Sequence, residues 1–445
     1  GNVSGAIATC NLVTSGQGVI SFNLTQEGRG YTTNPAVTVA GPTGVGTTAL
    51  VTSVIDIGSG QVSSFRFTNP GAGYTVSPAV TIADPDIITG RGNYLYNELN
   101  TKKKDILKKT GKIISVSAIS AKNINKKRKF RINKKIFYKD PFKIFKNNKI
   151  DILIEAIGQS DGISKKIVEF ALKNKIHVVT PNKALISKHG NNLSKLAEKN
   201  KVNLEFEASV GGGIPVLRTI KEGLATNKIS KVYGILNGTC NYILSEMEET
   251  KSGFSTVLKK AQLLGYAEPG NPKLDLNGYD ALAKVKILSA LAFNNKVSNS
   301  KCLMEGIENI EYKDLEIANQ LNYKIKLLGI TEIVNNKLFE RVHPCLIKKN
   351  TYIANVNGVM NAVIIEGNPV GESVLQGEGA GPGPTSSALM SDLLSILRGN
   401  IKYPFGISDD KRKSPSIYNT VIYSNALYIM LEAVSYTHLR AHETR

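Results

Sequence analysis

Strand and helix patterns alternate between residues 112 and 180, and this alternation restricts the fold more than any other feature of the chain. KIISVSAIS (112–120) and IDILIEAIG (150–158) are apolar runs of strand length. KKIVEFALKNK (165–175) has the apolar spacing of a helix and leads into the strand pattern HVVT (177–180). Strands joined through a helix lie parallel in one sheet, with helices on both faces. The sequence therefore predicts an α/β fold with a doubly wound parallel sheet.

The pattern changes in the second half of the chain. A strand pattern runs directly into a helix pattern in KVYGILNGTCNYIL (231–244), and a helical block covers residues 280–293. Further on, the Gly-rich turn GEGAGPGPT (377–385) opens another helix. Regular alternation of strand and helix has ended here, so we expect a second domain of the α+β class.

Residues 1–90 contain an internal repeat. GYTTNPAVTVAGP (30–42) returns as GYTVSPAVTIADP (73–85), 43 residues further on. Val, Thr and Ile alternate with small polar residues between Gly and Pro turns, which is typical of short strands. The segment resembles repeats found in virion and tail-fibre proteins of phages. We therefore expect two β-rich repeats of period 43 before the α/β part.

The formal net charge of +20 is unevenly distributed. Residues 101–150 hold 18 Lys and Arg against two acidic residues, whereas residues 1–100 hold three against five. A basic run can bind nucleic acid, but lysine is interleaved with Asn and Ile throughout the second part of the chain, as a composition bias would produce. We expect a solvated basic surface that assists a phosphorylated cofactor, with nucleic acid as the weaker alternative.

The sequence shows no membrane span and no secretion signal. Apolar runs of membrane-spanning length are absent, and no basic region followed by an apolar stretch opens the chain. The four cysteines are scattered, without the C-x-x-C spacing of a zinc site. These observations favour a cytoplasmic protein with reduced thiols and no membrane partner.

Carboxylates crowd the segment GYAEPGNPKLDLNGYDALAK (265–284) ahead of a lysine. Glu268, Asp275 and Asp280 lie among turn-forming Pro and Gly residues, and Lys284 follows on a predicted helix. Such a group could bind a substrate ammonium and supply a proton to a carbonyl oxygen. The alternative is structural, with Asp280 capping the helix and pairing with Lys284 one turn later. On spacing alone the structural interpretation is favoured.

This segment resembles the signature of homoserine dehydrogenases. It presents, in the family's order, Ala261, Gly265, Asn271, Pro272, Asp275, Gly278, Asp280 and Lys284. Four other blocks similar to that family are TPNKAL (180–185), EASVGGGIP (207–215), LNGTCNYIL (236–244) and GEGAGPGPTSSALMSDL (377–393). The resemblance covers about residues 93–413, and it reverses the preference in favour of a catalytic Lys284.

The resemblance implies NAD(P)H-dependent reduction of L-aspartate 4-semialdehyde to L-homoserine, a step towards threonine and methionine. Lys284 would protonate the oxygen as hydride reaches the aldehyde carbon. Glu268 and Asp280 would bind the substrate, with Asp275 nearby. Lys183 would reach the substrate or the nicotinamide from the other side and is the second catalytic candidate.

The resemblance also implies sites for a cofactor and for a cation. NADP is favoured over NAD because lysines, and no acidic residue, follow the strand pattern at 112–120. The residues expected to contact the cofactor are Lys183, Gly265, Gly379, Ile157 and Gly158. Oxygen atoms suit a hard monovalent cation such as sodium, and those expected to surround it belong to Glu207, Val210, Gly212 and Ile214. For both Gly-rich segments, a simple turn remains the alternative.

The domain boundaries follow from the same comparison of motifs. We expect an incomplete Rossmann-like NAD(P)-binding domain (93–205 and 379–400) and an α+β domain for substrate binding and homodimerisation (206–378). In the family, a first strand and a G-x-G-x-x-G loop precede NYLYNELN (93–100), where this chain has the end of the β repeat. We therefore expect impaired cofactor binding and low activity. The alternative is a non-enzymatic structural protein of the phage virion or tail-fibre kind.

Two segments near the C-terminus depart from the enzyme pattern. NALYIMLEAV (425–434) resembles the first strand of an ACT regulatory domain, and SYTHLRAHETR (435–445) resembles a translated sequencing adapter. We therefore expect a truncated ACT domain, an artefact-like tail and no feedback control by an amino acid.

Overall fold

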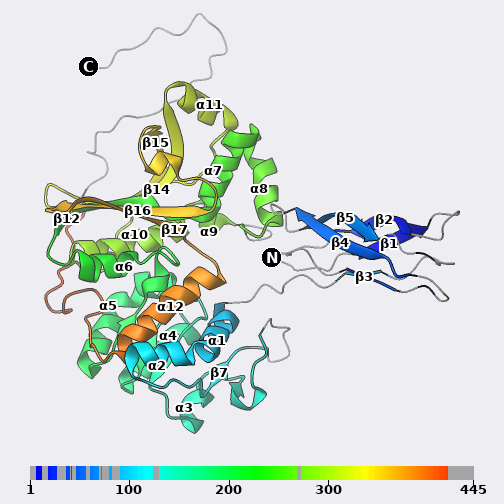
Figure 1. Ribbon diagram of the computed structural model, residues 1–445. Helices are drawn as coiled ribbons and strands as arrows, with labels where there is room; N and C mark the ends of the chain where they lie inside the picture. The colour runs from blue at the N-terminus through cyan, green and yellow to red at the C-terminus, as the bar shows by residue number, and fades with distance from the viewer. Residues whose placement is uncertain are drawn as a thin grey trace, which may run out of the picture.

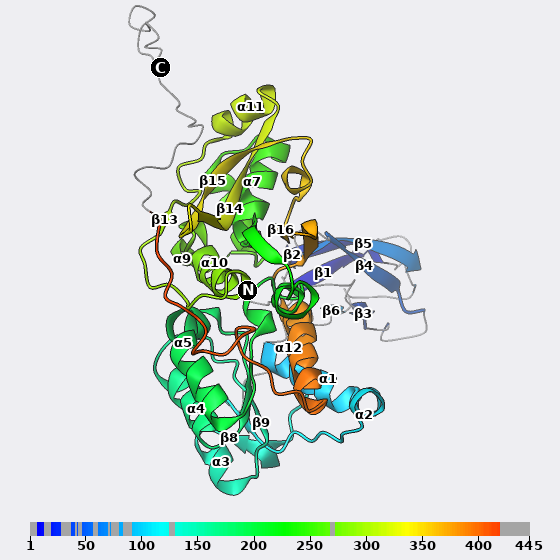
Figure 2. The ribbon, with the colours of Figure 1, turned by 90° about the vertical axis from the view of Figure 1, so that its left-hand side faces the viewer.

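The computed structural model describes residues 7–12, 19–27, 37–40, 42, 47–56, 61–69, 72, 80–82, 91–123, 130–267 and 272–418. Figure 1 shows two main units, a small sheet surrounded by α1 to α5 and α12, and a larger sheet accompanied by α7 to α11. Figure 2 shows the same two units turned by 90°, with the strands of the N-terminal segment to one side.

The first unit alternates helices with short strands. Its helices are α1 (Arg91–Thr101), α2 (Lys103–Thr110), α3 (Lys143–Asn147), α4 (Ile163–Lys173), α5 (Lys183–Asn200) and, returning from the far end of the chain, α12 (Pro382–Leu397). Its strands are β7 (Ile119–Ser120), β8 (Phe137–Tyr138), β9 (Ile152–Ile154), β10 (His177–Val179) and β11 (Leu204–Glu205), with the 3-10 helix η1 (Lys134–Ile136) before β8. β11, β10 and β9 form a three-stranded parallel sheet in that order.

Helices cover both faces of this three-stranded sheet. Leu153 and Val178 belong to the same buried cluster as α4 and α5, whereas Ile152, Ile154 and Val179 pack with α1 and α12. Successive residues of a strand point to opposite faces, so a strand covered on both faces is apolar throughout. The arrangement confirms the predicted doubly wound α/β architecture.

The strand predicted over residues 112–120 is the exception. Ile119–Ser120 pairs with Phe137–Tyr138, but residues 113–118 have no sheet partner in the described part of the chain. Ile114 and Val116 still pack against the cluster of α1 and α12. An extended run becomes a strand only when a neighbour takes its N–H and C=O groups. The neighbour expected from the family pattern would precede α1, and residues 83–90 lie outside the described residues.

The second unit is built on a six-stranded sheet of order β13-β15-β14-β12-β16-β17. The strands are β12 (Lys228–Ile235), β13 (Leu303–Met304), β14 (Tyr323–Val334), β15 (Lys337–Lys348), β16 (Met360–Asn368) and β17 (Gly371–Glu378). They are accompanied by α6 (Val216–Arg218), α7 (Gly238–Thr250), α8 (Phe254–Leu263), α9 (Lys273–Leu276), α10 (Tyr279–Ala292) and α11 (Tyr312–Gln320). Three short helical turns, η2 (Glu207–Ser209), η3 (Thr219–Gly223) and η4 (Ile353–Asn355), complete the unit, which is the expected α+β domain.

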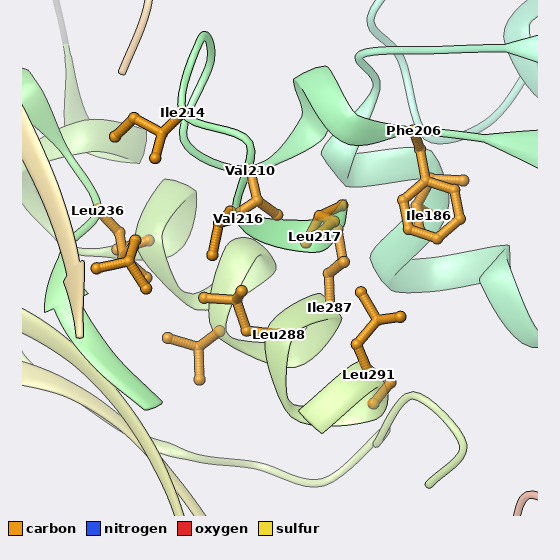
Figure 3. Close-up of a cluster of buried hydrophobic side chains, with 14 of the residues drawn as sticks. Ile186, Phe206, Val210, Ile214, Val216, Leu217, Leu236, Ile287, Leu288 and Leu291 are labelled. Carbon is orange, nitrogen blue, oxygen red and sulfur yellow. The ribbon is translucent and has the colours of Figure 1, made fainter. Parts of the chain in front are cut away.

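One hydrophobic core joins the two units around α10. Nine of the 14 residues of α10 are buried, so the helix is enclosed on nearly every side. Figure 3 shows Val216 and Leu217, from the segment that connects the units, beside Leu288 of α10, with Ile186 and Phe206 extending the cluster towards α5. Because α5 and α10 share this core, the first residues of both helices are held in a fixed relation.

Six strands are described between residues 7 and 82: β1 (Ile7–Leu12), β2 (Val19–Gln26), β3 (Val37–Val39), β4 (Leu50–Asp56), β5 (Gln61–Asn69) and β6 (Val80–Ile82). β1 pairs with β2, β4 with β5, and β3 with β6, all antiparallel. Thr38 lies opposite Thr81, its counterpart in the second repeat. Phe22 and its counterpart Phe65 have ring centroids 4.9 Å apart. Equivalent positions of the two repeats therefore face each other.

The described residues bear on the predictions about thiols and membrane spans, but not on those about the C-terminus. Cys240, Cys302 and Cys345 are free thiols. In the described part of the chain, no helix combines the length and the apolar character that crossing a membrane requires. The predicted ACT strand at 425–434 and the tail at 435–445 lie outside the described residues.

Candidate active site

Two lysines and an aspartate meet where α5 and α10 begin. Asp280 Oδ2 accepts a hydrogen bond from Lys284 Nζ at 2.7 Å, and Asp280 Oδ1 lies 2.6 Å from Lys183 Nζ. The Lys284 ammonium also donates to the carbonyl oxygen of Leu236 at 2.5 Å. An ammonium group has three N–H donors, so one donor of Lys284 is left for a bound molecule. A single carboxylate thus brings together two lysines that are far apart in the sequence.

The local sequence explains why these side chains converge. Gly278 precedes α10 with a φ of +84°, a left-handed conformation that favours glycine, and a Cβ there would lie 2.9 Å from Cγ1 of Val342. The side chain of Asn182 caps α5 by accepting a backbone N–H of its first turn at 3.0 Å. Lys183 is therefore the first residue of α5, where the helix dipole disfavours a cation. The negative charge of Asp280 offsets this cost.

Asn237 holds two acidic side chains next to each other. Its Nδ2 donates to Asp275 Oδ1 at 2.9 Å and to Asp280 Oδ2 at 3.2 Å, while its Oδ1 caps α7 by accepting from the N–H of Cys240 at 2.8 Å. The amide lies between two carboxylates that repel each other. Asn237 belongs to the family-like block LNGTCNYIL (236–244), in which no role was predicted for it. An Asn directly before a helix pattern was the available signal.

Burial and neighbouring charges shift the pKa values of this cluster. Burial lowers the pKa of Lys284, and the Lys183 ammonium lowers it further, against the opposing effect of Asp280. Burial alone would raise the pKa of Asp280, but Lys284 and Lys183 outweigh burial and hold it well below the usual range. Burial and then the charge of Asp280 raise the pKa of Asp275. The cluster therefore combines an ionised Asp280 with a lysine that releases its proton more readily than usual.

Three of the residues predicted to contact the cofactor lie on open turns. The exposed Ile157 and Gly158 follow β9, and Gly265 follows α8. Gly158 and Gly265 have φ values of +93° and +77°, and a Cβ at either would meet nothing within 4 Å. Open backbone of this kind allows the close approach of a nucleotide. The turns therefore fit the predicted cofactor.

Gly379 was also predicted to contact the cofactor, and close packing explains why a glycine is needed at this position. A Cβ there would lie 2.1 Å from Nδ2 of Asn361, and a Cβ on Gly212 would lie 2.4 Å from the carbonyl oxygen of Gly379. The N–H of Gly213 donates to the carbonyl of Glu378 at 3.2 Å. The two Gly-rich segments thus pack backbone against backbone, which residue spacing does not reveal.

Glu207 is buried beside the first of these Gly-rich segments. Its carboxylate accepts the N–H groups of Leu217 at 2.9 Å and Arg218 at 2.8 Å, and burial raises its pKa. Val210, Gly212 and Ile214, the other predicted cation ligands, lie on the turn that follows. Among the described residues, no group of three or more His, Cys, Asp or Glu side chains could hold a metal. A cation here would depend on backbone carbonyls.

Glu268 was predicted to bind the substrate, and it lies outside the described residues. The structure therefore brings together Lys183, Lys284, Asp275 and Asp280 of the predicted substrate site. The role of Glu268 stays a prediction.

A doubly wound α/β unit joined to a unit built on a larger mixed sheet is the fold of an NAD(P)-dependent dehydrogenase. Two family models match the chain: "Homoserine dehydrogenase, NAD binding domain" over residues 92–207 and "Homoserine dehydrogenase" over residues 215–394. The chain belongs to the homoserine dehydrogenase family and has its oxidoreductase function.

Relatives and solved structures agree with this assignment. The chain is 43% identical over 300 residues to homoserine dehydrogenase of Neisseria gonorrhoeae, covering 67% of this chain and 68% of the relative. It is 40% identical over 313 residues to the Pseudomonas aeruginosa enzyme, covering 70% and 71%. The crystal structure of a homoserine dehydrogenase from Thiobacillus denitrificans superposes with a TM-score of 0.69 at 36% identity, covering 74% of this chain and 78% of the other. These matches lend no support to the alternative of a non-enzymatic virion protein.

Proposed function

We propose that Lys183, Asp280 and Lys284 form the catalytic centre for the reduction of L-aspartate 4-semialdehyde to L-homoserine with NADPH. The observation that carries the proposal is the Asp280 carboxylate, which binds one lysine with each of its two oxygens. Lys183 and Asp280 lie in the first turns of two helices that share one core, and Lys284 lies one turn after Asp280, so the cluster is rigid. A rigid arrangement of charges favours a transition state without reorganisation.

Lys284 acts as the proton donor in this proposal. The bound nicotinamide would supply hydride to the aldehyde carbon. Negative charge then develops on the aldehyde oxygen, where a buried ammonium stabilises it more strongly than an exposed one. Since the pKa of Lys284 is lowered, its proton moves more readily in the reduction, and the neutral amine is available as a base in the reverse direction.

Carboxylates bind the substrate ammonium in this proposal. Both oxygens of Asp280 are engaged by lysines, so its first task is to hold Lys183 and Lys284 in place. Asp275 uses one oxygen for the amide of Asn237, and we assign its second oxygen to the ammonium, together with the carboxylate of Glu268.

Oxidation of NADPH by the purified chain with L-aspartate 4-semialdehyde tests the proposed function. We expect turnover, with a higher kcat/KM for NADPH than for NADH, because exposed Lys122 follows β7 without an acidic neighbour. We also expect a high KM for the cofactor, since the sequence before NYLYNELN (93–100) lacks the complete G-x-G-x-x-G loop that the resemblance implies for the pyrophosphate. Complete absence of turnover at saturating cofactor would contradict the proposed function, and equal use of NADH would contradict the preference for NADP.

We propose that Glu207 and the carbonyl groups of Val210, Gly212 and Ile214 surround a monovalent cation such as sodium. The supporting observation is a surplus of negative charge in the buried cluster next to them. Three carboxylates meet two cationic side chains there: Glu205, Glu207, Asp392, Lys221 and Arg218. Burial raises the pKa of both Glu207 and Asp392, and the charge of Glu205 raises the pKa of Asp392 further.

Thermal unfolding in different salts tests the cation proposal. A ligand that binds the folded state alone stabilises it by mass action. We therefore expect the Tm to rise with sodium chloride more than with choline chloride of equal ionic strength, because choline is too large for a ring of carbonyl oxygens. Identical curves in the two salts would rule out a bound sodium ion.

We propose that the chain forms a homodimer through its six-stranded sheet. Among the described strands, β17 pairs with β16 alone, and half-buried apolar side chains such as Tyr233 and Ile347 extend one of the sheet's buried clusters. An edge strand and an apolar sheet face both favour association. The mass measured by light scattering at micromolar concentration would show a monomer if the proposal is wrong.

A further inference from the structure

One buried carboxylate outside the catalytic cluster accepts four hydrogen bonds. Glu155 follows β9 and is 2% exposed. Its Oε1 accepts from the N–H groups of Ile157 at 2.7 Å and Gly158 at 3.2 Å and from the Ser164 hydroxyl at 2.7 Å. Its Oε2 accepts from the Thr180 hydroxyl at 2.6 Å. A carboxylate removed from water is costly unless donors surround it, and this one is fully surrounded.

The hydrogen-bond network continues to Asn182, the residue before Lys183. The Thr180 hydroxyl oxygen accepts from the N–H of Asn182 at 3.0 Å. The side-chain amide of Asn182 donates to the Ser164 hydroxyl at 2.9 Å and to the carbonyl of Gln159 at 2.8 Å. The same side chain caps α5, the helix that Lys183 opens. Two hydrogen-bond steps therefore connect Glu155 to the residue next to Lys183.

Hydrogen bonds, rather than apolar packing, fix the loop after β9. Residues 156–159 are exposed on their outer side, and Gly158 has the positive φ of +93°. Apolar burial therefore holds this loop weakly. Glu155 binds the loop from below through two consecutive backbone N–H groups, and through Thr180 it binds the turn that follows β10.

We propose that Glu155 is a positioning residue that fixes two parts of the active site at once. One part is the loop with Ile157 and Gly158, to which we assign cofactor contact. The other is the start of α5, from which Lys183 reaches Asp280. The inference rests on the proposed roles of these residues, and it adds that a single carboxylate sets the distance between them. Displacement of reacting groups by about 1 Å can lower a rate about 100-fold.

Amide hydrogen exchange in three variants tests the coupling without any turnover. Glu155→Ala removes all four acceptor contacts, and we expect faster exchange both at residues 156–160 and at residues 181–187. Thr180→Val keeps the shape of the side chain but removes its hydrogen bonds with Glu155 and Asn182, leaving only the link through Ser164. Exchange should therefore rise more at 181–187 than at 156–160, where the bonds from Ile157 and Gly158 to Glu155 remain. Glu169→Ala on α4, where the side chain makes a surface ion pair with Lys165 at 3.8 Å, is the matched control and should change neither segment.

Exchange in the hairpin of β14 and β15 (Tyr323–Lys348) separates local from global effects. If Glu155→Ala also accelerates exchange in this hairpin, the variant has lost stability as a whole. The coupling is then tested by Thr180→Val and Glu155→Gln. Glu155→Gln keeps one acceptor oxygen, so it should restore most of the protection at 156–160. Unchanged exchange at 181–187 in both Thr180→Val and Glu155→Ala would overturn the proposal.

Steady-state kinetics add a second readout. We expect Thr180→Val to lower kcat about 10-fold or more and to raise the cofactor KM less than Glu155→Ala does, because the bonds from Ile157 and Gly158 to Glu155 remain. Glu155→Ala should lower kcat and raise the cofactor KM. Equal effects of both variants on the cofactor KM would show that Glu155 has only a general structural role. If the unmodified chain shows no turnover, the proposed function fails, while the exchange measurements still decide the coupling.

Discussion

Replacement of Lys284 by alanine should lower kcat for semialdehyde reduction about a thousandfold, within the range expected for loss of a positioned general acid. The ammonium is buried, and two of its donors are used by Leu236 and Asp280, which leaves one donor for the substrate oxygen. Without this donor, the charge that develops on the oxygen loses one of the two ammonium groups that Asp280 holds. The KM for the cofactor should change little, because Lys284 is not among the proposed cofactor contacts.

Lys286→Ala is the matched control for this prediction. Lys286 lies on the same helix, and its Nζ donates to the carbonyl of Ser300 at 3.1 Å, away from the catalytic cluster. We expect this variant to retain its kcat. Small primary amines added to Lys284→Ala should restore part of the rate and should have no effect on Lys286→Ala. A Lys284→Ala rate within tenfold of the original would eliminate Lys284 as the proton donor.

Much of the fold could be predicted because each element carries its own local pattern. The helix at 165–175 and the strands at 150–158 and 177–180 were visible from apolar spacing, and their parallel pairing follows from the helix between them. The prediction of a strand at 112–120 was wrong for most of that range, although the sequence there is as apolar as that of β9. Strand formation there depends on a partner segment, and local sequence carries no information about whether that partner is present.

The active site could be predicted in part, for a similar reason. Asp280 and Lys284 are one helical turn apart, so their pairing follows from the sequence. Lys183 lies almost one hundred residues earlier, and its contact with Asp280 depends on how α5 and α10 share a core. Glu155, Asn182 and Asn237 were missed because their importance comes from hydrogen bonds across loops. An asparagine directly before a helix pattern indicates a cap, as for Asn182 and Asn237, but no spacing rule indicates the contacts across loops.

Asp280→Asn should destabilise the folded state and move the pH dependence of catalysis. The variant removes the negative charge that lies 2.7 Å from Lys284 Nζ and 2.6 Å from Lys183 Nζ, and it leaves two ammonium groups near each other. Loss of one partner from a buried ion pair costs about 3–5 kcal/mol of unfolding free energy. Since the folded-state pKa of Asp280 is lowered, its stabilisation is complete above the ordinary value of 3.8 and is lost as the pH falls through the folded-state value. Urea denaturation should therefore show the largest difference between the two chains at neutral pH and a smaller difference in strong acid.

The pH profile of kcat separates the catalytic role of Asp280 from its effect on stability. Burial and Lys183 lower the pKa of Lys284, and Asp280 is the main group that opposes them. Without Asp280, the pKa of Lys284 should fall further, so the rate of reduction, which needs the protonated amine, should decline at a lower pH than in the unmodified chain. Asp275→Asn is the comparison. Asp275 makes its hydrogen bond with Asn237 and raises the pKa of Lys284 less than Asp280 does, so the pH profile of this variant should move less. An alkaline limb of the Asp280→Asn profile at the same pH as in the unmodified chain would show that Asp280 does not raise the pKa of Lys284. The shared carboxylate would then hold the two helices together without taking part in the proton transfer.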